Sequence, residues 1–534
     1  MKTIYKKSRI LWVFVLGLFV MSSCTKNFDA LNTNPSKVTQ AQSLGDFQYI
    51  AGFLPDMEKN IASPTDYIYQ TQQNLNADIF SGYMASPDFG FGPNNANYFM
   101  RYDWNNQAFD TGNQSIMNDW SKVEQLARPQ DSHFVAIALI LKVEGMHRVT
   151  DIYGPIPYSK YGSNAFFIPY DAQQDIYTRF FTELDTAVNT LTAYIKANPG
   201  SQPFKPYDYF YGGDYKQWLK FANTLRLRLA MHIVYADPAT AQKQAEKAVA
   251  DPNGLLSTAS DDALLNQVNG LTYQNSLWNI TNGYQDISMG APMQSILEGY
   301  HDPREGVYFL KSTDAANTYE AIRSGLTITT PIYIKFSLLN VSATTPMQIF
   351  NASESYFLRA EGALRGWNMG AGTAQSFYEA GVMASFADKG VSMPAGYLAD
   401  ATSVAQPYVD PADGSNNIPA GNPYLNNITI KWDAGASFEQ NLQRIITQKW
   451  LAIYPDGEEA WTDFRRTGYP KQFIVKVNNS GGTISTTGYV RRLPYSTSEN
   501  QNNPKGVATG VAALGGPDNG GTKVWWDKNP LEPK

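Results

Sequence analysis

The sequence predicts a mainly α-helical protein in which tetratricopeptide-like helical hairpins pack against a loop-rich, irregular region. Three observations support this. Several stretches place apolar residues at helical spacing, such stretches follow one another in pairs, and long segments rich in Gly, Asn, Pro and aromatic residues separate the pairs. Alanine and glycine recur where paired helices must touch, as in tetratricopeptide stacking, although no strict repeat period is present.

The chain begins with the features of an export signal. Residues 1–23 carry four basic residues and no acidic ones, and they contain the apolar run Ile10–Met21, which ends in Ser22 and Ser23. The run is too short to cross a membrane, which takes about 20 apolar residues. Cys24 follows at once in a sequence that resembles a bacterial lipobox. We therefore expect residues 1–23 to be removed as a lipoprotein signal peptide and Cys24 to carry the lipid.

Charge and cysteine content exclude some classes of protein. The formal net charge is −6 and becomes about −10 when the basic signal is removed, which argues against a nucleic-acid partner. Cys24 is the only cysteine, so no intrachain disulfide is possible and the core alone must stabilise the fold. Aromatic residues make up 13% of the chain and charged residues only 17%, which suits an exported protein with neutral hydrogen-bonding and stacking surfaces.

The remaining elements follow in order along the chain. Residues 24–45 are polar, contain Pro35, and predict a lipidated tether, and residues 46–534 predict a single domain. Helical hairpins are expected around 131–250 and 353–387, and a late helix around 438–466. The clearest pattern lies in 214–238, where Asp214 is a candidate helix cap and Pro238 lies beyond the apolar stripe. Long loops are expected over 80–120, 260–350, 387–437 and 475–534.

Eight stretches spread along the chain, in a fixed order, resemble one family of proteins. They are NFDALNTNPSKVT, VTDIYGPIPYSKY with IPYDAQQDIY, GDYKQWLKFANTLRLRLAM, HDPREGVYF, YFLRAEGALRGW, IITQKWLAIYPDGEEAWTDFRRTGYP, RRLPYSTSE and GGPDNGGTKVWWDK. Together they cover essentially the whole chain after the signal. The sequence is identified as similar to the SusD/RagB family of nutrient-binding outer-membrane lipoproteins of Bacteroidetes.

The resemblance implies a fold and a function. The fold would be tetratricopeptide-like hairpins packed against an irregular ligand-binding region. Members of the family are lipid-anchored proteins of the outer membrane, facing the cell exterior, that capture oligosaccharides or sometimes peptides and pass them to a SusC-like TonB-dependent transporter. They are not enzymes and use no cofactor.

Two loop clusters have the chemistry of a carbohydrate site. A sugar ring offers an apolar C–H face surrounded by hydroxyls, so a binder needs exposed aromatic rings beside neutral donors and acceptors. The first cluster is within 81–106 and the second within 271–286. The aromatic candidates are Phe89, Tyr98, Trp104, Tyr273, Trp278 and Tyr284, and the polar candidates are Asn275 and Asn282. For each ring the alternative is that it anchors its loop to the body of the protein.

Other motifs favour structural roles. Glu458 and Glu459 form a carboxylate pair, but glycosidases hold their two acids across a bound sugar, and Arg465 and Arg466 offer nearby ion-pair partners. The four histidines show no zinc-binding spacing, and the stretch 410–417 lacks the ligand pattern of a calcium loop. We therefore expect no catalytic residue and no metal ligand.

Three functions remain open at this stage. The protein is a glycan-binding lipoprotein, a peptide-binding protein of the same architecture, or a surface glycoside hydrolase. The first two differ in ligand specificity, and the third differs from both in turnover of substrate.

Overall fold

The computed structural model describes residues 45–87, 90–163 and 165–530. The predicted signal peptide, Cys24 and nearly all of the tether lie outside the described residues, as does Phe89. The chain divides into a unit ending at Tyr49 and a second unit from Ile50 onward, and the architecture below is that of the second unit.

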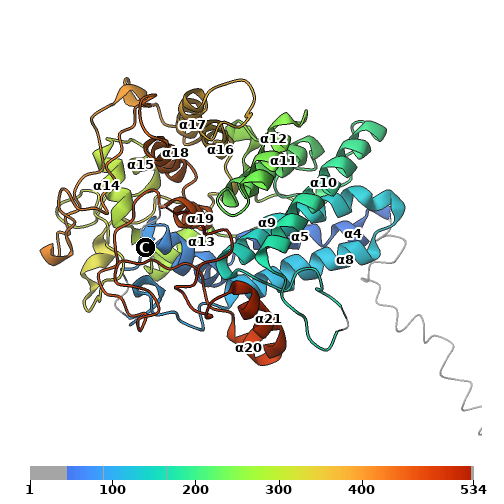
Figure 1. Ribbon diagram of the computed structural model, residues 1–534, viewed down its shortest axis with the longest axis horizontal. Coiled ribbons are helices and arrows are strands. Elements are labelled where there is room, and N and C mark those ends of the chain that lie inside the picture. The colour runs from blue at the N-terminus through green and yellow to red at the C-terminus, as the bar shows by residue number, and fades with distance from the viewer. Residues whose placement is uncertain (1–44, 88–89, 164, 531–534) are drawn as a thin grey trace, which may run out of the picture. The chain divides into compact units, whose positions relative to one another are not determined.

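Helices dominate the regular structure, as Figure 1 shows. The α-helices are α4 (Gln48–Ala51), α5 (Leu54–Ile61), α6 (Asp66–Tyr69), α7 (Gln107–Thr111), α8 (Asn118–Leu126), α9 (Ser132–Tyr153), α10 (Gln173–Ala197), α11 (Tyr215–His232), α12 (Pro238–Ala250), α13 (Ser276–Trp278), α14 (Ala291–Gly299), α15 (Glu305–Tyr308), α16 (Glu354–Leu364), α17 (Ala374–Asp388), α18 (Phe438–Ala452), α19 (Gly457–Thr467), α20 (Thr497–Asn502) and α21 (Pro504–Leu514). Wider π-type turns form η1 (Gln70–Asp78), η3 (Gly112–Met117) and η7 (Asn279–Tyr284). The mainly α-helical fold class predicted from the sequence is confirmed.

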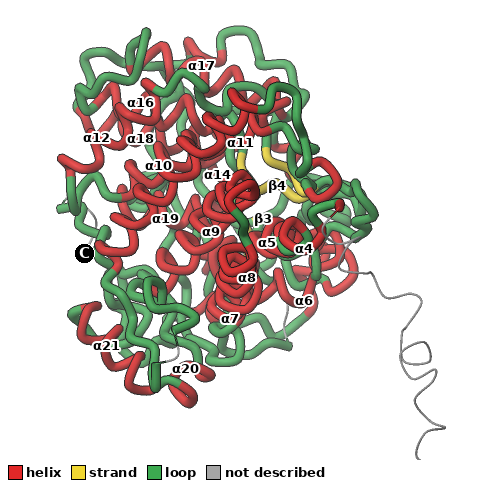
Figure 2. Tube along the Cα trace, turned by 90° about the vertical axis from the view of Figure 1, so that its right-hand side faces the viewer, coloured by secondary structure: helices red, strands yellow, loops and turns green. Residues whose placement is uncertain are grey.

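Two short strand pairs tie the loops to the helices. β1 (Met84–Ala85) pairs antiparallel with β3 (Ser288–Met289), and β2 (Ala263–Leu265) pairs antiparallel with β4 (Met347–Phe350). Figure 2 shows strands as short yellow segments among the helices. In the first pair Ala85 lies opposite Ser288, so the chain that leaves β1 and the chain that enters β3 emerge at the same end.

The helical hairpins form where apolar periodicity predicts them. α9 packs on α10, α11 on α12 and α16 on α17, with α10 also against α11 and α16 against α18. Asp214 caps α11 as expected, because its carboxylate accepts a hydrogen bond of 2.9 Å from the Lys216 amide. The apolar stripe of α11, including Trp218, Phe221 and Leu225, is fully buried.

Two predicted boundaries were wrong. The late helix expected over 438–466 is two helices, because Pro455 has no amide hydrogen to continue α18 and Asp456 caps the new helix α19. The segments expected as long loops also contain helices: α7, η3 and α8 fall in the first, α13, η7, α14 and α15 in the second, and α20 and α21 in the last. Short or wide helices of this kind carry a weak periodic signal.

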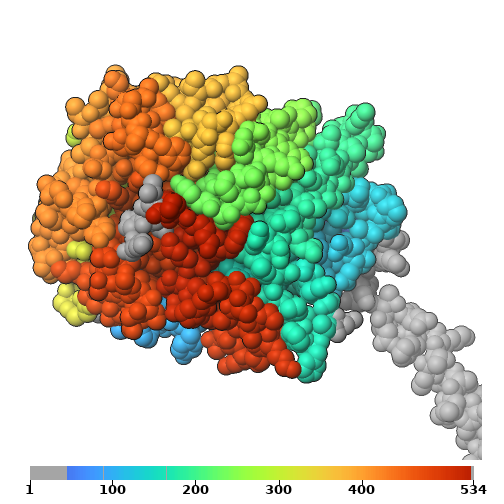
Figure 3. All heavy atoms as spheres, in the orientation of Figure 1, coloured from blue at the N-terminus to red at the C-terminus, as the bar shows by residue number. Residues whose placement is uncertain are grey.

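The C-terminal residues cross one face of this unit. In Figure 3 the red residues lie between the hairpins, in teal and green, and the orange loop-rich region. Trp526 is fully buried there, and its indole nitrogen donates a hydrogen bond of 2.6 Å to Asp151 of α9. The end of the chain therefore fastens the loop-rich region to the hairpins.

A buried network of charges holds α19 among the hairpins. The Lys449 ammonium of α18 lies 2.6 Å from Glu459 and 2.8 Å from Asp463 of α19, and 3.1 Å from Glu354 of α16. Arg228 of α11 pairs with Glu354 at 2.5 Å. All five side chains are buried. Each charge thus faces an opposite charge on another helix, which offsets the cost of burying it.

The ion-pair partners predicted for Glu458 and Glu459 were wrong. Arg465 donates hydrogen bonds to the backbone oxygens of Asp151, at 2.5 Å, and Arg491, at 3.0 Å, and Arg466 pairs with Glu361 at 2.7 Å. Glu458 and Glu459 lie about two turns before the arginines on α19, and Arg466 instead pairs also with Asp463, one turn away, at 2.7 Å.

The start of α19 presses directly on η1. A Cβ atom at Gly457 would lie 2.6 Å from the Cα atom of Asp78, so only glycine permits this approach. η1 continues directly from α6, and the charge network therefore positions α6 through α19 and η1. Among the described residues, none of the helices combines the length and apolar character needed to cross a membrane.

Candidate functional site

The two aromatic loop clusters predicted from the sequence emerge beside each other. The first follows β1 and the second precedes β3, and these strands are paired. α6 lies against α13, at the start of the second cluster. The loops, the β1–β3 pair and the α6–η1 helix thus form one region of the molecule, set on the helical frame.

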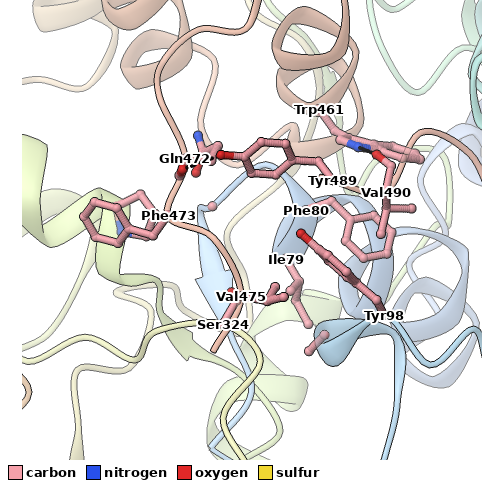
Figure 4. A pocket seen from close by; sticks show the side chains of 13 residues that line it. Ile79, Phe80, Tyr98, Ser324, Trp461, Gln472, Phe473, Val475, Tyr489 and Val490 are labelled. Atoms are coloured by element: carbon pink, nitrogen blue, oxygen red, sulfur yellow. Dashed lines mark hydrogen bonds between the residues drawn. The ribbon is translucent and has the colours of Figure 1, made fainter. Parts of the chain in front are cut away.

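Trp104 and Tyr98 of the first cluster are anchors. Trp104 is 8% exposed, packs edge-on against Phe91 with ring centroids 5.1 Å apart, and lies under the Arg101 guanidinium. Tyr98 is 5% exposed, and burial raises the pKa of its hydroxyl well above the ordinary value. Figure 4 shows the Tyr98 ring pointing toward Ile79 and Phe80 at a small cavity of about 30 Å³. Neither ring offers a free face to a ligand.

The second cluster is pinned to a neighbouring loop by Asn275. Its side-chain oxygen caps α13 by accepting from the amides of Leu277, at 2.9 Å, and Trp278, and its side-chain nitrogen donates to the Thr345 carbonyl at 3.0 Å. Asn275 is 3% exposed. Its polar atoms are therefore used within the protein, and it shapes the loop.

Tyr273 has a similar anchoring role. The Tyr273 hydroxyl accepts a hydrogen bond of 3.1 Å from the Met347 amide of β4, and it donates a hydrogen bond to the Leu265 carbonyl of β2. The ring is half-buried. Tyr273 thus ties the start of the loop to the second strand pair.

Trp278 and Tyr284 lie on the outer side of this cluster. Tyr284 is 44% exposed, and burial together with the nearby Asp66 carboxylate of α6 raises the pKa of its hydroxyl. Trp278 is half-buried. The side-chain amide of the exposed Asn282 donates a hydrogen bond of 3.0 Å to the backbone carbonyl of Trp278. Two of the predicted aromatic candidates therefore combine with a predicted polar one at the surface.

Tyr67, which sequence reasoning missed, adjoins this group. It follows Asp66 in α6 and is 64% exposed, and the Asp66 carboxylate accepts hydrogen bonds from the Tyr67 amide, at 2.7 Å, and from the side chain of Asn279. The sequence signal is weak because Tyr67 lies in a short amphipathic stretch, where an aromatic residue is more often part of the core. We call Tyr67, Trp278 and Tyr284 the aromatic platform.

Polar groups surround the platform. The Gln70 amide of η1 donates a hydrogen bond of 2.5 Å to the Asp286 carboxylate, and Asn279 is also half-buried here. Amide and carboxylate groups at the edge of exposed rings match the pattern of a sugar, whose hydroxyls both donate and accept hydrogen bonds around an apolar face. The arrangement is suited to binding a polyhydroxylated ring.

Two histidines meet inside the helical frame, where the sequence spacing gave no sign of a cluster. Ligand atoms of His147, Asp151 and His232 all lie within 4.8 Å of one another. Although burial opposes it, the carboxylates of Glu144 and Asp151 raise the pKa of His147 to about 9. His232 lies 3.3 Å from Asp151 and 3.0 Å from Glu459, so the cluster is suited to buried ion pairing.

The comparisons with known proteins agree with this architecture. The family described as "SusD-like: Susd and RagB outer membrane lipoprotein" matches residues 30–527. No curated protein matches the chain.

Several solved structures are similar over nearly their whole length. A chitin-binding SusD homolog from Flavobacterium johnsoniae is 48% identical, with a TM-score of 0.86, and the match covers 90% of this chain and 99% of that one. A SusD homolog from Bacteroides uniformis is 36% identical, with a TM-score of 0.84 and the same shares covered. One from Bacteroides vulgatus is 36% identical, with a TM-score of 0.85, over 91% and 100% of the two chains. The chain therefore belongs to the SusD-like family of outer membrane lipoproteins.

Proposed function

We propose that this protein is a glycan-binding lipoprotein of the cell surface that captures an oligosaccharide and delivers it to a SusC-like TonB-dependent transporter. Cys24 would carry the lipid that holds it on the outer membrane, facing the exterior. The observation that supports glycan binding is the aromatic platform, in which exposed rings of Tyr67 and Tyr284 lie among side-chain amides and carboxylates.

The similarity to a chitin-binding homolog makes a chitin-type glycan the first ligand to test. Chitin is a neutral polymer of amide-bearing sugars, and its rings present C–H faces that can stack on aromatic side chains. The acidic groups beside the platform, Asp66 and Asp286, can accept hydrogen bonds from sugar hydroxyls and would repel polyanionic glycans.

The proposed role is binding without turnover. Glu458 and Glu459, the carboxylate pair noted in the sequence, are both buried, and Glu459 is held by Lys449 and His232 inside the frame. Although burial opposes it, the Lys449 ammonium and its neighbours hold the pKa of Glu459 well below the ordinary value. A carboxylate engaged in this way cannot act as a general acid on an external sugar.

The test is affinity-gel electrophoresis of a soluble form that lacks residues 1–24. Each gel contains one polysaccharide, either a soluble chitin derivative or a plant, host or fungal polysaccharide. We expect one polysaccharide to retard the protein and Trp278→Ala or Tyr284→Ala to abolish the retardation. Phe166→Ala is the matched control, because Phe166 is 94% exposed on the loop between α9 and α10.

Three other results would change the conclusion. Retardation that survives both platform substitutions would place the glycan site elsewhere on the protein. Absence of retardation in every gel, together with binding of a peptide digest, would assign the same architecture to peptide capture. Release of reducing sugar during the assay would indicate a glycoside hydrolase.

A further inference from the structure

A separate cavity lies beneath the segment 271–286, which carries Trp278 and Tyr284 of the platform. It has a volume of about 320 Å³, and Asn275 and Leu277 of this loop form part of its wall. Asn340, Thr345 and Pro346 lie at its edge and are exposed, so the cavity opens to solvent at this loop. None of the three platform residues is among those that line it. Pockets for small ligands start at about this size, roughly 300 Å³.

Most of the cavity wall is apolar or aromatic. The apolar side chains are Leu264, Leu277, Val307, Leu339, Val341, Pro346 and Met347, and the aromatic ones are Tyr69, Tyr308 and Tyr454. The Tyr308 hydroxyl donates a hydrogen bond of 2.7 Å to the Leu451 carbonyl, so it is already paired within the protein. Its ring therefore contributes to the wall mainly as an apolar surface, which suits the C–H face of a sugar ring.

Charged groups gather at one part of this wall. The Lys389 ammonium lies 2.9 Å from Asp388 and donates 3.0 Å to the Gln348 side chain. Asp388 also accepts a hydrogen bond of 2.7 Å from the Asn351 side-chain amide, and Asp262 accepts one of 2.6 Å from the Ala352 backbone amide. Asp262 lies beside Asp388, and burial and the nearby Asp388 carboxylate both raise the pKa of Asp262.

This cluster is close to electrically neutral. Burial and the neighbouring Asp388 raise the pKa of Asp262 to about 9, so Asp262 is protonated at neutral pH. The single negative charge on Asp388 is then balanced by Lys389. The other charged pair lining the cavity, Arg148 with Asp456 at 2.8 Å, is also balanced. A charged ligand would add an unbalanced charge to this cavity. A purely apolar ligand would displace water from the polar cluster without offering it hydrogen bonds.

We propose that this cavity is a second carbohydrate site, which takes one neutral sugar unit with its C–H face on the aliphatic and tyrosine walls and its hydroxyls at Asp262, Asp388 and Lys389. The inference rests on the proposed glycan function but concerns a different part of the protein. The cavity is too small for a polysaccharide chain, so it selects a single sugar or the end of a chain, while the platform binds along the chain.

The test measures binding of single sugars to the soluble protein by isothermal titration calorimetry and saturation-transfer NMR. The probes are N-acetylglucosamine, glucose, galactose, mannose and xylose. We expect at least one to bind the wild type, and Val341→Trp to weaken that binding about tenfold or more, since the added ring fills the cavity. Val409→Trp is the matched control, because Val409 is 63% exposed and does not line the cavity.

A second pair of variants tests the polar cluster. Asp262→Asn keeps an oxygen for the Ala352 amide and an N–H for Asp388, so it mimics the protonated acid and should retain sugar binding. Asp262→Leu removes both groups and should weaken sugar binding about tenfold or more. Circular dichroism and thermal melting establish that each variant is folded.

The proposal is overturned if none of the five sugars binds the wild type, or if Val341→Trp binds them as the wild type does. Retardation in the polysaccharide gel reports the proposed function separately. Val341→Trp should still be retarded, whereas Tyr284→Ala should lose retardation and keep single-sugar binding. If Val341→Trp loses both readouts, the cavity is not a separate site. If the wild type is not retarded by any gel, the proposed function fails by itself.

Discussion

At the scale of single residues, aromatic side chains of the same segment have opposite roles. Trp104 is buried under a loop, whereas Tyr102, two residues earlier, is 74% exposed. The Tyr273 hydroxyl bonds to the backbone of two strands, whereas Tyr284 is 44% exposed beside Asp66. Stability and ligand binding can therefore be separated by substitution at individual aromatic residues.

Trp104→Ala should lower the free energy of unfolding by about 3–5 kcal/mol, because it removes a large buried ring and leaves a cavity. Urea denaturation measures the change. Tyr102→Ala is the control, and its effect should stay within about 0.5 kcal/mol, as is usual at exposed positions. Equal effects of the two substitutions would contradict the anchoring role of Trp104.

Lys449→Met should destabilise the protein by about 3–5 kcal/mol, because it leaves Glu354, Glu459 and Asp463 buried without their shared cation. Lys247→Met removes the exposed pair with Asp185 and should cost less than about 1 kcal/mol. Chemical denaturation compares the two variants. A small loss for Lys449→Met would mean that α19 is held by apolar packing alone.

At the scale of elements, close contacts between helices explain the small residues seen in the sequence. Gly381 of α17 faces Phe357 of α16, and a Cβ atom at Gly381 would lie 2.9 Å from the phenyl ring. Glycine at this position lets the two helices of the hairpin approach. The alanine and glycine pattern that predicted tetratricopeptide-like stacking thus marks a position where a larger side chain would collide with the facing helix.

Gly381→Val should destabilise the α16–α17 hairpin by about 1–3 kcal/mol, because the added side chain forces the Phe357 ring out of its position. Ala384→Val on the same helix is the control, since it adds a β-branched side chain at a half-buried position. Ala384→Val lowers the helix propensity whereas Gly381→Val raises it, so a larger loss of stability at Gly381 can come only from crowding. Thermal unfolding of both variants measures the difference. Similar melting temperatures would show that the hairpin adjusts to the extra volume.

At the scale of the whole molecule, buried titratable groups make stability depend on pH. His147 has a pKa raised to about 9, so its contribution is complete below its ordinary value of 6.5 and is lost as the pH rises through 9. Asp262, with a pKa raised to about 9, also favours the folded state less as the pH rises. Glu144 is opposite: despite burial, Arg148 and His147 lower its pKa to about 2, so its contribution is lost in acid.

The free energy of unfolding should therefore fall between pH 6.5 and pH 9, by a few kcal/mol for His147 alone. Urea denaturation at a series of pH values measures the slope. His147→Gln should flatten the slope, whereas His301→Gln, at an exposed position, should leave it unchanged. A slope that is the same in both variants would exclude His147 as a source of the pH dependence.

The sequence by itself determined the helical hairpins and the family, and it predicted the region of the candidate site. These follow from local patterns: apolar periodicity, a cap such as Asp214, and aromatic residues among amides. Only the tertiary structure decided that Tyr67 is exposed and Trp104 buried, that Glu459 pairs with His232, and that a cavity lies under Asn275. Exposure and ion pairing depend on segments hundreds of residues apart, and no local pattern encodes which of them will meet.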